Sequence, residues 1–355
     1  MSFRPLYRDL DPLRLAQYLR RCVEDLRSVS EQHRQSLLPA RAFEADGGLP
    51  PDARSETFTV DRHHVLSQEF LAIEADVDLP HVEGCCPAIH FRCGRRSEGV
   101  LYIDGEIATG IGTSIWDDGE PVWLPELAGG THNLLLHVER DEGDGAMRPA
   151  ERSTLECFDA VLMHEATYRL AIAIDLAVEL YSQLDETAAS RQPIRSALRS
   201  VAESLPMHDE QAVRQAAPYI LQNLIDEVFS GQETQPIRVG VFGHAHIDLA
   251  WLWTPDKSRR KSVRTFASQL RLAERFPWAV FQQGQVPLYD WVREDAPELF
   301  DRVRHALASG QFQADGTIFI EPDTLALGAS QPERFALHQL WADVLPDTNV
   351  RAVSG

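Results

Sequence analysis

The chain has 355 residues, a length typical of two or three domains, with 44% hydrophobic and 25% charged residues as in folded globular proteins. The formal net charge of −20 disfavours a general nucleic-acid or anionic-membrane surface, because both would repel an acidic protein. Five cysteines are too few for a disulfide scaffold, and neither a secretory leader nor an apolar run of about 18 residues occurs, so we expect a cytoplasmic protein without a membrane span.

The N-terminal region predicts a helix followed by a linker. Asp11-Pro12 is typical of a helix start, and apolar residues then recur at three- and four-residue steps, which predicts a helix over residues 8–35. The following stretch, residues 39–55, is rich in Gly and Pro and predicts a linker.

A β-sandwich and a helical connector are predicted next. Between residues 57 and 163, short apolar runs alternate with turn signals, among them the hairpin signal Asp104-Gly105. Residues 164–230 return to helical periodicity and contain three predicted helices.

The remaining chain alternates between strand and helix patterns. A β-branched run at Ile237–Phe242 predicts a buried strand, and the alternation predicts parallel βαβ units that are incomplete at Gly355. Further strands are predicted over residues 278–282, 317–320 and 350–353, and helices over residues 262–276, 288–294 and 297–309. The chain is therefore predicted to be a multidomain α+β protein divided into an N-terminal helix and linker, a β-sandwich, a helical connector and the start of an α/β domain, over residues 1–54, 55–165, 166–235 and 236–355.

The most informative motif, Gly243-His-Ala-His-Ile-Asp248, stands at the end of the first predicted α/β strand. In an extended backbone, His244, His246 and Asp248 project to one side, and two imidazoles with a carboxylate suit zinc or a related divalent ion. The carboxyl end of a parallel strand is also where α/β proteins collect their ligands. The motif leaves open whether all three residues bind the metal, and it does not name a reaction.

Three further features stand near this motif. Trp251 is equally compatible with a platform for a sugar ring and with core packing. The basic run Arg259-Arg260-Lys261 with Arg264 is interpreted as a solvated helix start whose cations pair with acidic residues elsewhere. The pair of acids in Glu321-Pro322-Asp323, which follows a predicted strand, could line the same pocket.

From residue 237 to about residue 330 the chain resembles the glycoside hydrolase family 38 α-mannosidases. The residues that carry the resemblance are Gly243-His-Ala-His-Ile-Asp-Leu-Ala-Trp-Leu-Trp253, Arg264-Thr-Phe266, Phe281-Gln-Gln-Gly-Gln285, Leu288-Tyr-Asp-Trp291, Gly310-Gln-Phe-Gln313 and Ile320-Glu-Pro-Asp323. The upstream segments Leu101–Gly105 and Val122–Glu126 resemble the N-terminal region of the cytosolic and bacterial branch of that family.

The resemblance implies a retaining exo-α-mannosidase that acts on mannose-containing oligosaccharides with one Zn²⁺ ion. It implies that His246 and Asp248 bind the metal and that Trp251 lines the subsite of the terminal mannose. It also implies the opening of a seven-stranded, barrel-like α/β catalytic domain. The family's nucleophile lies downstream of the Glu-Pro-Asp segment, so we expect it beyond Gly355 and expect this chain to be an inactive fragment without catalytic residues. Homo-oligomerisation is left open.

Two alternatives stay open. A metal-dependent amidohydrolase also places two histidines after its first barrel strand and would bind metal through His244 and His246. A non-catalytic remnant would bind glycan through the sandwich, where Trp116 and Trp123 are the available aromatic platforms.

Overall fold

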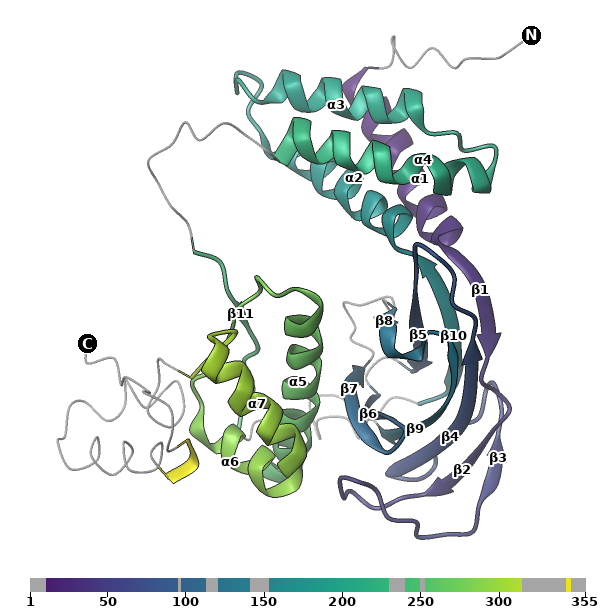
Figure 1. The fold of residues 1–355 in the computed structure, drawn as a ribbon, viewed down its shortest axis with the longest axis vertical. Coiled ribbons are helices and arrows are strands. Elements are labelled where there is room, and N and C mark those ends of the chain that lie inside the picture. The colour runs from purple at the N-terminus through teal and green to yellow at the C-terminus, as the bar shows by residue number, and fades with distance from the viewer. Residues whose placement is uncertain are drawn as a thin grey trace, which may run out of the picture.

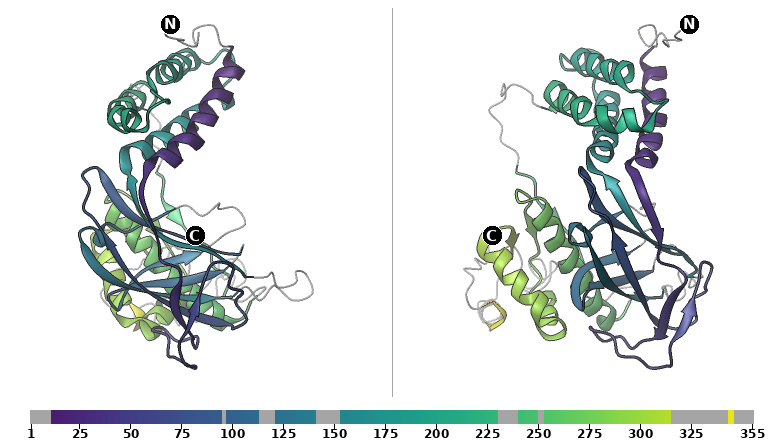
Figure 2. Two further views of the ribbon diagram at one scale, coloured as in Figure 1. Left: turned by 90° about the vertical axis from the view of Figure 1, so that its right-hand side faces the viewer. Right: turned by 45° about the vertical axis from the view of Figure 1, so that its right-hand side comes forward.

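The computed structural model describes residues 11–94, 97–112, 121–140, 153–229, 240–249, 253–314 and 343–345. Within these residues the protein is a mixed α/β structure with a helical bundle, a β-sandwich and a smaller α/β unit (Figure 1). The bundle stands at one end of the sandwich, and the α/β unit lies against one side of it (Figure 2). Of the helices in the described part of the chain, none has the length and apolar character needed to cross a bilayer.

Four helices pack around one apolar core to form the bundle. They are α1 (Pro12–Ser30), α2 (Glu165–Gln183), α3 (Arg191–Ser204) and α4 (Glu210–Leu224), which continues as the π-helical turn η3 (Ile225–Phe229). Helix α1 begins at the predicted Asp11-Pro12 signal, because the Asp11 carboxylate accepts a hydrogen bond from the Arg14 backbone N–H at 3.0 Å, and residues 8–10 of the predicted helix lie outside the described residues. The apolar faces of all four helices meet around Leu19, Ile174 and Leu198. The N-terminal helix and the connector helices therefore share a single core.

The sandwich consists of two antiparallel sheets with strand orders β1-β10-β5-β8 and β3-β2-β4-β9-β6-β7. Its strands are β1 (Glu31–Ser36), β2 (Ala40–Glu44), β3 (Phe58–Val60), β4 (Phe70–Leu79), β5 (Cys85–Cys93), β6 (Glu98–Ile103), β7 (Glu106–Gly112), β8 (Val122–Trp123), β9 (Gly130–Glu139) and β10 (Leu155–His164), and the 3₁₀ turn η2 spans Pro125–Leu127. Buried side chains from both sheets, including Ile73, Ile89 and Phe158, fill the space between them.

The prediction of a β-sandwich is confirmed, but the predicted position of its first strands was wrong. Residues 31–35, predicted as helix, form strand β1, and the predicted linker contains strand β2. Strand β1 lies at a sheet edge with mostly exposed polar side chains, so it lacks the apolar alternation that identifies a strand. The Asp104-Gly105 hairpin is confirmed, since both residues have positive φ, 53° and 89°, in the turn between β6 and β7.

The α/β unit has three parallel strands in the order β11-β12-β13. The strands are β11 (Gly243–His244), β12 (Phe281–Gln282) and β13 (Phe312–Gln313); α5 (Pro255–Arg275) connects the first two, and α6 (Val286–Asp295) and α7 (Pro297–Ser309) connect the second to the third. These connections confirm the predicted βαβ pattern and the predicted helices. The prediction of a buried strand ending at Phe242 was wrong in its described residues, because Val241 and Phe242 are 87% and 56% exposed and the strand is Gly243–His244. Strand β13 was not predicted, and the strands predicted over residues 317–320 and 350–353 lie outside the described residues.

Helix α5 packs on two sides, against its own unit and against the sandwich. It lies along strand β7, as Figures 1 and 2 show from different directions. At the closest point, a Cβ atom added to Gly110 of β7 would lie 2.6 Å from the backbone oxygen of Arg264 in α5. Only glycine therefore permits this contact between the two parts.

Candidate functional site

The candidate metal ligands His246 and Asp248 lie in the loop that follows strand β11, at the carboxyl edge of the parallel sheet. The Nε2 atom of His246 is 3.1 Å from the Oδ1 atom of Asp248. Ile247 between them is buried at 5% exposure, whereas the His246 side chain is 49% exposed. The alternation expected for an extended segment thus places the imidazole and the carboxylate together on the accessible side.

Hydrogen bonds to three backbone carbonyls fix the course of this loop. The Gln283 amide donates to the Ala245 oxygen at 2.8 Å, and the Gln285 amide donates to the Ile247 oxygen at 3.0 Å. From the other side, the Ser258 hydroxyl of α5 donates to the Asp248 backbone oxygen at 2.8 Å. Both glutamines are buried, so these bonds replace solvent at the carbonyls and restrict the loop.

One of these glutamines, Gln283, is itself held in place by hydrogen bonds. The Gln283 Oε1 atom accepts from the Gln285 backbone N–H at 3.0 Å, and the Tyr289 hydroxyl donates to the Gln283 backbone oxygen at 2.7 Å. The sequence predicted a strand over residues 278–282 and a family resemblance over Phe281–Gln285, but not this support of the loop. Two buried amides next to a strand end are the signal that could have identified a loop support.

A zinc ion fits the donors of this pair but needs further ligands. Zinc binds imidazole nitrogen and carboxylate oxygen at about 2.0–2.1 Å, so two such donors on a tetrahedral ion lie about 3.3 Å apart. The 3.1 Å between His246 and Asp248 is close to that spacing, and it also suits a direct hydrogen bond. No cluster of three or more His, Cys, Asp or Glu residues with metal-site geometry occurs within the described ranges.

His244 is oriented differently. Its Nδ1 atom lies 3.0 Å from the backbone oxygen of Gln282, and its ring centroid lies 6.5 Å from that of His246. Two imidazoles bound to one tetrahedral ion would have centroids about 5 Å apart. His246 and Asp248 are therefore better placed to bind one metal ion together than His244 and His246 are.

His246 opens onto a cleft of about 350 Å³ between α5 and the sandwich. Ala245 and Ile247 line it from the β11 side, Gly110 and Gly112 from strand β7, and Lys261, Arg264 and Thr265 from α5. A sandwich strand thus forms one wall of the space that the candidate ligand faces.

The remaining predicted site residues belong to the sandwich or to parts of the chain that the structure does not describe. Trp251, Trp116 and the Glu321–Asp323 segment lie outside the described residues. Trp123, the other predicted sandwich platform, carries the Arg275 guanidinium over its ring at 4.0 Å and meets the Tyr168 ring edge-on at 5.1 Å. These contacts cover part of the aromatic surface, and Trp123 also lines a hollow of about 1030 Å³.

The basic run on α5 forms an ion cluster with the sandwich, and the sequence predicted this cluster only in part. Its cations pair with acidic residues elsewhere, as interpreted: Arg260 and Arg264 both donate to Glu139, each at 3.0 Å. The prediction of a solvated helix start was wrong for Arg264, which is 8% exposed. Its guanidinium fills the contact between α5 and the sandwich.

The surrounding cations keep the pKa values of both glutamates in the cluster low. Burial acts to raise the pKa of Glu139, but hydrogen bonding to Arg260 and the charges of Arg264 and Lys257 outweigh burial and lower that pKa to about 2. The pKa of Glu98 is likewise lowered, because Arg264 and Lys261 outweigh the effect of burial. Both carboxylates are therefore ionised at neutral pH.

Comparisons with known proteins point to one family. Residues 236–333 match the profile of the glycosyl hydrolases family 38 N-terminal domain. The alpha-mannosidase G of Dictyostelium discoideum is 23% identical over 246 residues, which are 66% of this chain and 22% of that protein. The alpha-mannosidase of Saccharomyces cerevisiae is 33% identical over 141 residues, 37% of this chain and 13% of that protein. The alpha-mannosidase 2C1 of Homo sapiens is 27% identical over 249 residues, 66% of this chain and 23% of that protein.

The solved CBM51-2 and INT domains from Clostridium perfringens ZmpB align over 68% of this chain and 50% of that chain at 16% identity, with a TM-score of 0.19, too low to establish a common fold. The chain spans less than a quarter of the length of the curated relatives given above. The loop with His246 and Asp248 falls inside the matched segment. Over that segment the chain is similar to the N-terminal domain of the family 38 glycosyl hydrolases, and it resembles the alpha-mannosidases given above over part of their length.

Proposed function

We propose that this chain is the metal-holding N-terminal portion of a retaining exo-α-mannosidase, with Zn²⁺ bound by His246 and Asp248. The observation that carries the proposal is the 3.1 Å approach of these two side chains at the carboxyl edge of a parallel sheet, beside an open cleft. The family match over residues 236–333 supplies the reaction class. In this proposal the α/β unit is the opening of the family's barrel-like catalytic domain.

The roles of the chain's own residues follow from their positions. A bound zinc would contact hydroxyl groups of the terminal mannose, and Trp251 would cover the apolar face of that sugar. Gln283, Gln285 and Ser258 hold the loop so that the imidazole and the carboxylate stay together. Retaining cleavage needs two carboxyl groups about 5 Å apart, and we propose that neither is contained in this chain. The isolated chain should therefore bind metal weakly and show no turnover.

Metal titration with site variants tests this assignment. Isothermal titration calorimetry with Zn²⁺ should show binding to the 355-residue chain and loss of binding in His246→Ala and Asp248→Ala. The matched control His244→Ala should keep the affinity of the unmodified chain, whereas an amidohydrolase-like site would lose it. Metal binding that survives both the His246 and the Asp248 substitutions would refute the ligand assignment.

An activity assay tests the fragment proposal separately. Incubation of the chain with an aryl α-mannoside and Zn²⁺ should release no mannose above the rate of the His246→Ala control. Turnover that the control lacks would show that this chain holds a working pair of carboxylates. The glycan substrate and the cytoplasmic location stay predictions.

A further inference from the structure

Two glutamates of the sandwich carry like charges at directly opposite positions. Glu98 at the start of β6 and Glu139 at the end of β9 are register partners in the antiparallel ladder. Like charges in such a pair destabilise a sheet, more so because Glu139 is only 5% exposed. The arrangement therefore requires cations that cover both carboxylates.

Helix α5 supplies these cations from one face. Lys257, Arg260, Lys261 and Arg264 follow the spacing of three and four residues that places side chains in one stripe of a helix. Lys257 lies 3.5 Å from Glu139 and Lys261 lies 2.5 Å from Glu98, while Arg264 bridges both glutamates. The sandwich thus fixes both the rotation and the position of α5.

A continuous series of contacts leads from this cluster to the candidate metal ligand. The Lys261 ammonium that pairs with Glu98 lies 4.7 Å from the centroid of the Trp253 ring. The Trp253 indole N–H donates to the Ser258 hydroxyl at 2.8 Å, and that hydroxyl donates to the Asp248 backbone oxygen at 2.8 Å. Ser258 is fully buried, so water does not compete for either of these hydrogen bonds.

We propose that Glu98 and Ser258 are positioning residues for the metal ligand Asp248, so that the β-sandwich sets the affinity of the site on the α/β unit. This inference rests on the proposed metal-binding function. Groups that orient a metal ligand by hydrogen bonding typically change metal affinity by 10- to 100-fold when removed. Glu98 acts on Asp248 only through Lys261, Trp253 and Ser258, so its removal should weaken metal binding less than the removal of Ser258.

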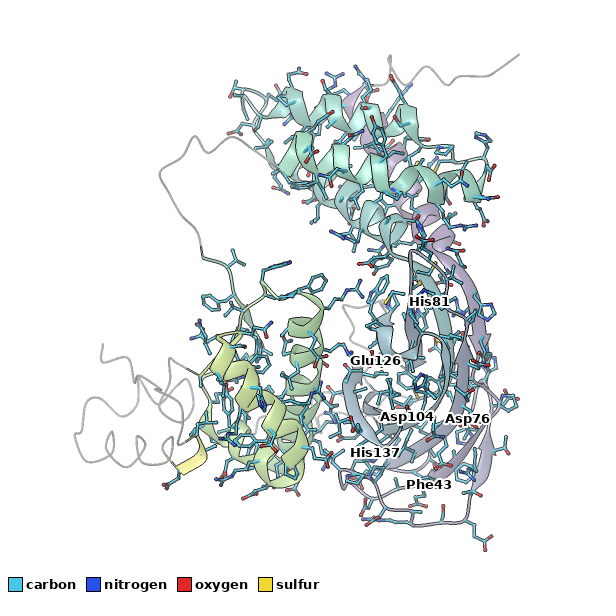
Figure 3. The ribbon with its side chains drawn as sticks, viewed as in Figure 1. Phe43, Asp76, His81, Asp104, Glu126 and His137 are labelled. Carbon is cyan, nitrogen blue, oxygen red and sulfur yellow. The ribbon has the colours of Figure 1, made fainter. Side chains whose placement is uncertain are left out.

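The test compares variants along this series with a matched control elsewhere on the same interface. Glu98→Gln removes the charge that holds Lys261, and Ser258→Ala removes the donor to Asp248. The control is Glu126→Gln, which breaks the ion pair between η2 and Arg271 of α5 without touching Trp253 or Ser258. Glu126 is labelled on the sandwich in Figure 3, toward the α/β unit.

Calorimetry with Zn²⁺ on the full chain should show an affinity about 10-fold weaker for Ser258→Ala and several-fold weaker for Glu98→Gln. The affinity of the control Glu126→Gln should stay within about twofold of the unmodified chain. The visible absorption of bound Co²⁺ should change in the two positioning variants and not in the control, because the geometry of the ligand changes. Urea unfolding of each variant reports any general loss of structure.

Unchanged affinity in Ser258→Ala and Glu98→Gln would overturn the inference while leaving the metal site intact. Weakening that also appears in Glu126→Gln, in proportion to the loss of unfolding midpoint, would show a merely structural role and would equally overturn it. Failure of the proposed function looks different, because the unmodified chain would then bind no zinc or would bind it independently of His246 and Asp248.

Discussion

The β-sandwich and the α/β unit are stabilised in different ways. Strands β4 and β9 of the sandwich pair over ten residues, from Phe70 opposite Glu139 to Leu79 opposite Gly130. The three strands of the α/β unit are two residues long each. The sandwich therefore holds its own strands by backbone ladders, whereas the parallel sheet depends on packing against its helices.

This difference affects the candidate site directly. Short strands fix few backbone groups, so the loop after β11 is restrained by side chains, namely Gln283, Gln285 and Ser258. Helix α5, which contributes Ser258, is in turn held by the sandwich through Glu98 and Glu139. The α/β unit, which carries the candidate ligands, is thus held in position partly by the β-sandwich.

Core truncation should show the largest contrast between the two parts. Phe266 of α5 is fully buried and contacts Phe281, Tyr289 and Phe312, which together form the centre of the α/β core. Phe266→Ala should cost about 3–5 kcal/mol and should abolish a separate folding transition of the α/β unit in urea. Circular dichroism and tryptophan fluorescence, followed together, measure both parts.

The matched variant is Phe158→Ala, which removes a fully buried ring of similar size from the sandwich core. We expect the transition at the higher urea concentration to shift in this variant, because the longer ladders of the sandwich survive to a higher concentration. A single transition that shifts equally in both variants would show that the two parts unfold as one.

Removing a buried charge at the contact should have the next largest effect. Glu139→Gln leaves Arg260 and Arg264 without their carboxylate, and breaking a buried ion pair from one side costs about 3 kcal/mol or more. The loss should appear in the α/β transition, since that unit depends on the contact. An equal loss confined to the sandwich transition would contradict this dependence.

The same carboxylate predicts how stability responds to acid. The pKa of Glu139 is lowered from 4.5 to about 2 in the folded protein, so its contribution is complete above the unfolded value and is lost as the pH falls toward 2. At pH 3 the unmodified chain should have lost about 2 kcal/mol through this group alone. Glu139→Gln should lack this part of the pH dependence, which urea unfolding between pH 6 and pH 3 measures. If the free energy of unfolding of the two proteins changed equally with pH, this contribution of Glu139 would be excluded.

Much of the architecture was predictable because it rests on local patterns. Helix α1 follows from Asp11 and its apolar periodicity, and the β6–β7 hairpin follows from Asp104-Gly105. Strand β1 was not predictable in this way, because its polar edge residues owe their conformation to pairing with β10. Its neighbour in sequence, α1, carries a helical pattern that gave no sign of an abrupt end at Ser30.

At the candidate site, only the close approach of the two candidate ligands was predictable. The spacing of His246 and Asp248 places them on one side of an extended segment, and their 3.1 Å approach agrees with that expectation. The contact between Glu98 and Lys261 was not predictable, because the two residues are 163 positions apart in the sequence. Such a contact depends on the docking of two units, which a local pattern does not encode.

Removing one side chain that supports the loop after β11 should have a smaller effect on stability. Gln283→Leu keeps much of the side-chain volume but leaves the Ala245 oxygen without its 2.8 Å donor and the Gln285 backbone N–H without its 3.0 Å acceptor. Leaving such groups unsatisfied costs about 1–3 kcal/mol, so the α/β transition should move to lower urea concentration while the sandwich transition stays in place. Hydrogen exchange should also speed up in the loop after β11. Unchanged exchange there would show that Gln285 and Ser258 suffice to hold it.

The smallest effect should come from an ion pair within the sandwich itself. Arg41 of β2 and Glu74 of β4 pair across neighbouring strands, but the Arg41 side chain is 64% exposed, so solvent and salt screen the attraction. Glu74→Gln should therefore change the free energy of unfolding by less than about 0.5 kcal/mol. The same chemical change at Glu139 removes a carboxylate from a contact where water is excluded and several cations depend on it. Urea unfolding of the two variants side by side measures how much burial adds to one glutamate, and comparable losses would show that the contact between α5 and the sandwich is as solvated as the open sheet surface.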